Sequence, residues 1–89
     1  MTQAEFMDWA AHTVLEYLGT HGPFRPFEET TYFLEDIFIV WYCKTLQNHK
    51  ALLGSSQVSG AYFEFTYNGD KDEAYLDVYG KHENVVVKR

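Results

Sequence analysis

The sequence has 89 residues and a formal net charge of −6 at pH 7, from 13 Asp and Glu against 7 Lys and Arg. A chain of this length forms a single domain, residues 1–89, with a small hydrophobic core. Proteins that bind nucleic acid cluster basic residues to neutralise phosphates, and the basic residues here are scattered, so we expect no direct binding of nucleic acid. An acidic protein can instead offer carboxylates to a basic partner, although a modest negative charge also simply aids solubility.

Aromatic residues are numerous, with 7 Phe, 7 Tyr and 2 Trp. A core of this size cannot enclose all of them, so some aromatic area is expected on the surface, where it commonly marks a partner or a self-association face. The alternative for any one tyrosine is a half-buried ring with its hydroxyl in water.

A single cysteine, Cys43, precludes an internal disulfide and is typical of a reducing compartment. No apolar run approaches the roughly 20 residues that span a bilayer. The first residues include Glu5 and Asp8, which is unlike a signal peptide. We therefore expect a cytoplasmic protein that does not bind membranes.

The N-terminal residues predict a helix. Thr2 and Glu5 form a capping-box pattern, in which each side chain answers the backbone amide of the other. Gly19 is expected to end the helix in a left-handed conformation. Trp9 falls toward the solvent side, where it either covers an edge of the sheet or is an exposed anchor. One apolar stripe recurs at spacings of three and four residues: Phe6, Ala10, Thr13, Val14, Tyr17 and Leu18.

Residues 20–26 hold both prolines and predict a connecting loop. Residues 27–35 are ambiguous between a loop with one helical turn and the start of a strand. Residues 36–44 predict the central strand, because both of its faces are apolar and a strand of that kind is usually covered on both sides. In a regular strand Ile37, Ile39, Trp41 and Cys43 point one way, and Phe38, Val40 and Tyr42 point the other.

Three further strands follow in hairpins. The chain is expected to turn near Gln47–Asn48 and return over residues 50–55. Residues 60–67 and 73–79 alternate apolar and polar side chains, and Asn68–Gly69 predicts the turn between them. A loop over residues 69–72 pairs Asn68 with Glu73. Residues 80–84 are expected to turn again, and residues 85–87 to add a short edge strand. The prediction is an α+β fold, with one N-terminal amphipathic helix packed on a four- to five-stranded antiparallel meander sheet.

The sheet face opposite the helix is the candidate binding surface. In the predicted register Glu64 lies directly across from Asp77, and like charges in that position are destabilising. Either the register differs by two residues, or a cation from Lys44, Lys81 or a partner neutralises the pair. The alternative is ordinary polar decoration of a half-exposed sheet. The candidate binding residues are Tyr42, Lys44, Tyr62, Glu64, Tyr75, Asp77 and Tyr79.

Residues that could support catalysis or hold a metal form no convincing set. Cys43 and His49 fall at opposite parity around the first hairpin, so they are expected on opposite faces, with Cys43 as a small core residue. Residues 68–73 superficially match a calcium loop, but Glu73 stands where the loop requires Gly. The four histidines have no zinc-like spacing. We therefore expect that the protein is not an enzyme and that it binds no metal and no cofactor.

Five blocks of residues carry a family resemblance: residues 39–48, 50–52, 67–71, 75–77 and 83–85. They occur in order within residues 39–85, a span of just over half of the chain. They resemble a family of small uncharacterised proteins, with a domain of unknown function, encoded by phages and prophages of Gram-positive bacteria. The resemblance implies an origin and a size class, and it implies no catalytic residue.

The leading hypothesis is a non-enzymatic, phage-derived binding protein that inhibits a host or defence-system protein through its acidic, tyrosine-rich surface. Small acidic phage proteins often act in this way. One alternative is a protein that sequesters a small nucleotide ligand, which requires a concave pocket with Arg25 or lysines to meet phosphate. Another is a structural accessory protein that acts as a homodimer or larger homo-oligomer and buries its surplus aromatic side chains between copies.

Overall fold

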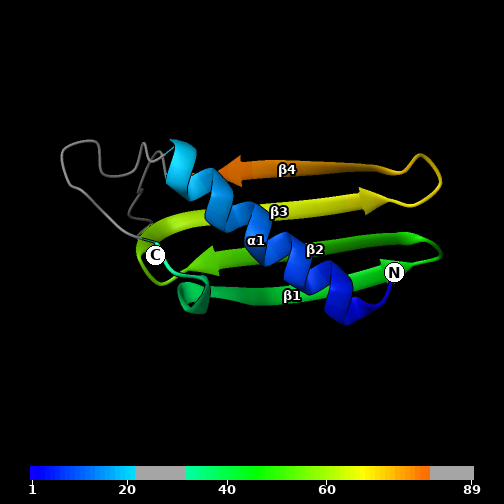
Figure 1. The fold of residues 1–89 in the computed structure, drawn as a ribbon, viewed down its shortest axis with the longest axis horizontal. Helices are drawn as coiled ribbons and strands as arrows, with labels where there is room; N and C mark the ends of the chain where they lie inside the picture. The colour runs from blue at the N-terminus through cyan, green and yellow to red at the C-terminus, as the bar shows by residue number, and fades with distance from the viewer. Residues whose placement is uncertain (22–31, 81–89) are drawn as a thin grey trace, which may run out of the picture.

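The computed structural model describes residues 1–21 and 32–80, so the predicted loop at 20–26 lies mostly outside the described residues and the predicted strand at 85–87 entirely so. The elements in chain order are α1 (Gln3–His21), the short 3₁₀ helix η1 (Leu34–Asp36), β1 (Ile37–Thr45), β2 (Asn48–Ser55), β3 (Val58–Asn68) and β4 (Glu73–Tyr79) (Figure 1).

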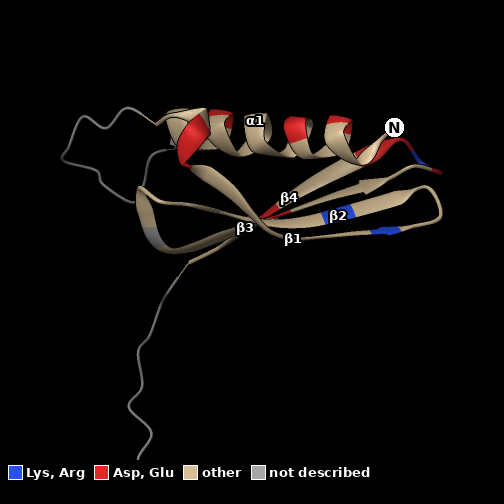
Figure 2. Cartoon of the chain, turned by 90° about the horizontal axis from the view of Figure 1, so that it is seen from below, with Lys and Arg blue, Asp and Glu red and all other residues tan. Residues whose placement is uncertain are grey.

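The four strands form one antiparallel sheet in the order β1-β2-β3-β4, and α1 lies across one of its faces (Figures 1 and 2). This confirms the α+β fold and the meander. The prediction that residues 36–44 form the central strand is wrong, because β1 lies at an edge of the sheet and β2 and β3 are central. A meander leaves its first strand at the edge whatever the composition of that strand.

The N-terminus of α1 has the predicted capping box. The Thr2 amide donates to Glu5 Oε1, and the Glu5 amide donates to Thr2 Oγ1, each at 3.1 Å. These bonds satisfy backbone amides that have no partner within the helix. The predicted end at Gly19 is wrong, since α1 continues to His21. Glycine permits the left-handed conformation but does not require it.

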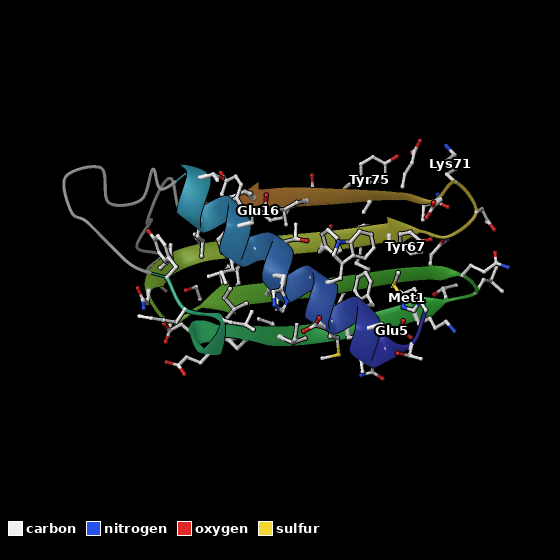
Figure 3. All side chains as sticks on the ribbon, viewed as in Figure 1. Met1, Glu5, Glu16, Tyr67, Lys71 and Tyr75 are labelled. Carbon is white, nitrogen blue, oxygen red and sulfur yellow. The ribbon has the colours of Figure 1, made fainter. Side chains whose placement is uncertain are left out.

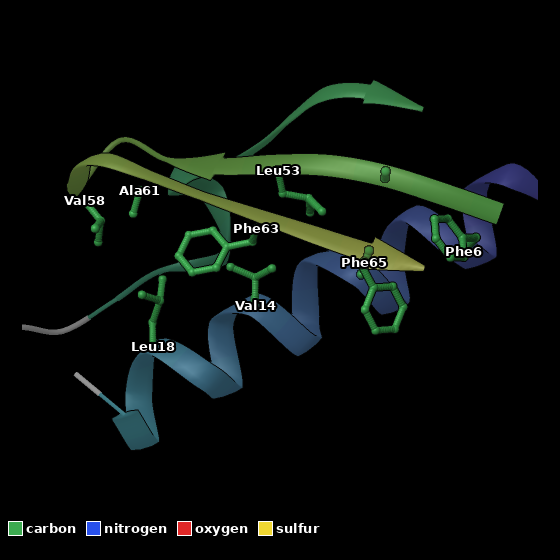
Figure 4. Close-up of a cluster of buried hydrophobic side chains, with 10 residues drawn as sticks. Phe6, Val14, Leu18, Leu53, Val58, Ala61, Phe63 and Phe65 are labelled. Atoms are coloured by element: carbon green, nitrogen blue, oxygen red, sulfur yellow. The ribbon is translucent and has the colours of Figure 1, made fainter. Parts of the chain in front are cut away.

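The core lies between α1 and the sheet (Figure 4). Phe6, Ala10, Val14 and Leu18 follow a four-residue spacing and are all fully buried. Trp9 covers the sheet, with its ring edge-on to Phe65 and Tyr67 at centroid distances of 4.9 and 5.5 Å. The strands contribute the buried residues Ala51, Leu53, Val58, Ala61, Phe63 and Phe65.

A β-bulge at Val40 interrupts β1. Ile39 lies opposite Leu53, and Trp41 lies opposite Leu52, the next residue of β2 in the pairing. Val40 is therefore an extra residue in β1 with no partner in β2. One extra residue reverses the alternation of side chains for the rest of the strand. Residues 37 and 39 therefore face α1 before the bulge, whereas even-numbered residues face it afterwards. The regular alternation predicted for residues 37–43 is wrong beyond Val40.

The β1–β2 hairpin and the β3–β4 hairpin differ in how well the sequence predicts them. The first turns at Leu46–Gln47, one residue earlier than expected, and Leu46 adopts a positive φ of 57°. The β3–β4 hairpin has the predicted register, with Asn68 opposite Glu73. Asn68 Oδ1 holds its turn by accepting the amides of Asp70 and Lys71.

Candidate binding surface

The side of the sheet away from α1 carries no other described element, and we call it the open face (Figure 2). Residues directly opposite each other on neighbouring strands point to the same side of a sheet, so the register defines its members. Its members include Phe38, Trp41, Cys43, Lys50, Leu52, Tyr62, Glu64, Thr66, Glu73, Tyr75, Asp77 and Tyr79.

The part of the open face on β1 and β2 is apolar. Trp41 lies opposite Leu52, and Phe38 lies opposite Gly54. A Cβ atom at position 54 would come within 2.6 Å of Phe38 Cζ, so the glycine allows the Phe38 ring to lie against β2. Phe38 and Tyr62 line a shallow cavity of about 280 Å³ at this end of the sheet.

The part on β3 and β4 combines tyrosines with carboxylates. Tyr62 lies opposite Tyr79, and Glu64 lies opposite Asp77, as predicted. The cation beside the carboxylate pair is Lys50, whose Nζ lies 3.3 Å from Glu64 Oε1. The prediction of Lys44 for this role is wrong, and Lys81 lies outside the described residues.

Five of the seven predicted binding residues meet on the open face: Tyr62, Glu64, Tyr75, Asp77 and Tyr79. Tyr42 and Lys44 do not join them, because the bulge at Val40 turns both toward α1. In a regular strand Tyr42 would share one face, and so one partner surface, with Phe38 and Val40. The bulge separates Tyr42 from Phe38, so they do not belong to the same surface.

Sequence reasoning missed Trp41, Lys50 and Leu52 as members of the open face. Lys50 and Leu52 could have been placed, because the buried His49, Ala51 and Leu53 alternate with them along β2. Trp41 could not, since no turn residue or glycine marks the bulge.

The opposite side of the first hairpin holds a buried histidine. His49 is 2% exposed, its ring stacks on Phe6 at 5.0 Å, and the Tyr42 hydroxyl lies 2.6 Å from His49 Nδ1. Burial, together with the nearby Lys44 ammonium, lowers the pKa of His49 below its usual value. The imidazole is therefore neutral at pH 7. A cavity of about 230 Å³ adjoins it, lined in part by Lys44 and Tyr67.

Cys43 and His49 lie on opposite faces, as predicted, so they cannot act as a nucleophile and its base. The expectation that Cys43 is a core residue is wrong, because its side chain is exposed on the open face. The bulge again accounts for the difference.

Comparison with known proteins gives one match. The sequence model of DUF6275, a family of unknown function, matches residues 7–89. This range contains all four strands. The chain belongs to this family. The whole open face lies inside the range that the DUF6275 model matches. Neither the curated proteins nor the solved structures include a match to the chain.

Two negative findings apply to residues 1–21 and 32–80. In this part of the chain no cluster of three or more His, Cys, Asp or Glu side chains could hold a metal ion. The described helices include none with the length and hydropathy needed to cross a membrane.

Proposed function

We propose that this protein is a non-enzymatic binding protein that holds a partner protein on its open face. The observation that supports the proposal is that α1 covers one face of the sheet and no other described element covers the open face. Five large aromatic side chains remain 39–51% exposed on the uncovered side: Phe38, Trp41, Tyr62, Tyr75 and Tyr79. Clustered exposed aromatic area of this kind is uncommon on surfaces that have no partner.

The composition of the open face resembles that of protein interfaces. Trp and Tyr are enriched where proteins meet, because they bury a large area while ordering few side-chain torsions. The apolar half around Trp41 and Leu52 would supply the desolvated centre. The carboxylates of Glu64 and Asp77 would favour a partner that presents Lys or Arg.

The partner that we propose is a host protein, either a cellular factor or a component of a defence system, which this protein inhibits in the bacterial cytoplasm. This step rests on the resemblance to phage-encoded proteins and on the acidic charge of the chain. Binding alone would suffice for inhibition, so no catalytic group is required.

Sequestration of a nucleotide is less well supported. The cavity beside His49 has Lys44 in its lining, but its volume of about 230 Å³ is below the roughly 300–1,000 Å³ typical of small-molecule sites. Among the described residues, no Lys or Arg lines the cavity between Phe38 and Tyr62.

The test is affinity capture from a bacterial lysate, followed by titration of each purified captured protein. The wild type should bind one protein tightly, whereas Trp41→Ala and the double variant Tyr62→Ala, Tyr79→Ala should lose it. Glu16→Ala, on the exposed side of α1 (Figure 3), is the matched control and should bind as the wild type does.

Circular dichroism and thermal melting must show that all the variants fold. A partner that binds the open-face variants with unchanged affinity would contradict the proposal. So would loss of binding that occurs only where folding is lost, because those residues would then belong to the core.

A further inference from the structure

The two edges of the sheet are built differently. β1 carries the bulge at Val40, a common device that prevents an edge strand from pairing with another chain. β4 pairs with β3 residue by residue without a register shift. It also contains no Pro or Lys over Glu73–Tyr79, and its charged side chains are those of Glu73 and Asp77.

Two copies of β4 can pair antiparallel only in certain registers. A two-fold axis normal to the sheet keeps both helices on the same side, and it places residues of equal parity opposite each other. An axis through Tyr75 would bring Glu73 opposite Asp77 of the second copy. An axis through Asp77 would bring that carboxylate opposite its own copy. Both registers are destabilised by like charges.

An axis through Leu76 avoids this repulsion. Tyr75 then lies opposite Asp77 of the second copy, and Glu73 lies opposite Tyr79. This is also the register that pairs all 7 residues of β4. We propose that two copies of this chain associate through β4, antiparallel about a two-fold axis at Leu76, to form one continuous eight-stranded sheet.

The side chains of β4 suit this arrangement on both faces. On the helix side, Ala74, Leu76 and Val78 are partly buried against the core, and pairing extends that apolar layer across the axis. On the open face, Tyr75 extends along the outer edge of the strand, where its hydroxyl donates to the Glu73 carboxylate (Figure 3). Each carboxylate of β4 therefore meets a tyrosine across the junction.

Among residues 1–21 and 32–80, no element covers the outer edge of β4. The helix runs diagonally over the sheet and approaches β4 only near its own C-terminal end (Figure 1). The two-fold axis places the two helix ends at opposite ends of the junction. The two open faces would lie side by side on one surface. The inference is independent of the proposed partner.

The first test measures the mass of the full-length protein by light scattering and sedimentation equilibrium over a range of concentrations. The wild type should reach the mass of a dimer. Tyr75→Asp should be monomeric, because it places Asp opposite Asp77 of the second copy. The exchange variant Tyr75→Asp, Asp77→Tyr restores a tyrosine opposite each carboxylate and should recover the dimer.

Tyr62→Asp is the control, since it makes the same change on the same face but on β3, away from the axis. It should remain dimeric. A wild type that is monomeric at every concentration would overturn the proposal. A dimer that Tyr62→Asp abolishes and Tyr75→Asp preserves would also overturn it, in favour of association through the open faces.

The second test is oxidative cross-linking in a Cys43→Ser background. Leu76→Cys places a thiol on the axis, where opposite Cα atoms in an antiparallel pair are about 4.5–5.5 Å apart, within the range for a disulfide. Val78→Cys lies about 14 Å from its own copy at about 3.4 Å per residue, and it should not cross-link. Equal cross-linking of both variants, or of neither, would show that the register is wrong.

Discussion

Glu64 on β3 lies directly opposite Asp77 on β4, and Lys50 on β2 reaches Glu64 at 3.3 Å. Three adjacent strands thus place two carboxylates and one ammonium on the open face. The arrangement offsets a like-charge contact that the register imposes.

Removal of the Lys50 ammonium should destabilise the fold. Lys50→Met keeps the aliphatic stem but leaves the two carboxylates facing each other, and the half-exposed position of Lys50 screens the effect. We expect a loss of about 0.5–1 kcal/mol in the free energy of unfolding, measured by urea denaturation at low salt. Added salt should reduce the difference. Lys71→Met, in the β3–β4 turn, should change the stability little.

Adjacent residues of β3 should differ sharply in their contribution to stability. Phe63 is fully buried beneath α1, whereas Tyr62 points to the open face. Phe63→Ala should cost about 3–5 kcal/mol, since it leaves a cavity in the core. Tyr62→Ala should stay within about 1 kcal/mol of the wild type. Comparable losses in urea denaturation would show that Tyr62 is packed within the monomer.

The stability should depend on pH through His49. Its pKa is lowered in the fold by burial and by Lys44, so below pH 6.5 the unfolded chain binds a proton more readily than the folded one. Stability from this group is complete above pH 6.5 and is lost as the pH falls through the lowered pKa. His49→Gln should remove this part of the pH profile. An NMR titration in which His49 protonates above pH 6.5 would contradict the sign.

The hydrogen bond between Tyr42 and His49 should contribute to stability. Tyr42→Phe leaves His49 Nδ1 without its partner at a buried position, and we expect a loss of about 1–2 kcal/mol. The measurement is thermal or urea unfolding at pH 7.5. Tyr79→Phe, on the exposed open face, is the matched control and should be close to neutral. If both variants lost the same amount of stability, the hydrogen bond between Tyr42 and His49 would not be the cause of the loss.

The position of Phe38 should depend on Gly54. Gly54→Ala introduces a Cβ that overlaps the Phe38 ring, and the ring can swing into solvent because it is half exposed. The stability should change by less than about 1 kcal/mol, since Ala also favours the strand over Gly. NMR contacts between the ring and β2 should disappear. Their persistence in the variant would show that the backbone moves instead.

Features that depend on residues close together in the chain could be predicted from the sequence. Thr2 and Glu5 are three residues apart, so their capping bonds form wherever the helix packs. The register of β3 and β4 follows from the turn at Asn68 and from period-two alternation, and it placed Glu64 opposite Asp77. Five of the seven candidate binding residues came from this local reasoning.

The place of β1 in the sheet and the direction of its side chains depend on how the strands pack, and they could not be predicted from the sequence. Apolar composition on both faces predicts burial, but strand order left β1 at the edge, and the register with β2 placed the bulge at Val40. That one inserted residue moved Trp41 and Cys43 to the open face and turned Tyr42 and Lys44 toward α1. A bulge depends on how a strand fits its neighbour, and no residue of β1 marks it in advance.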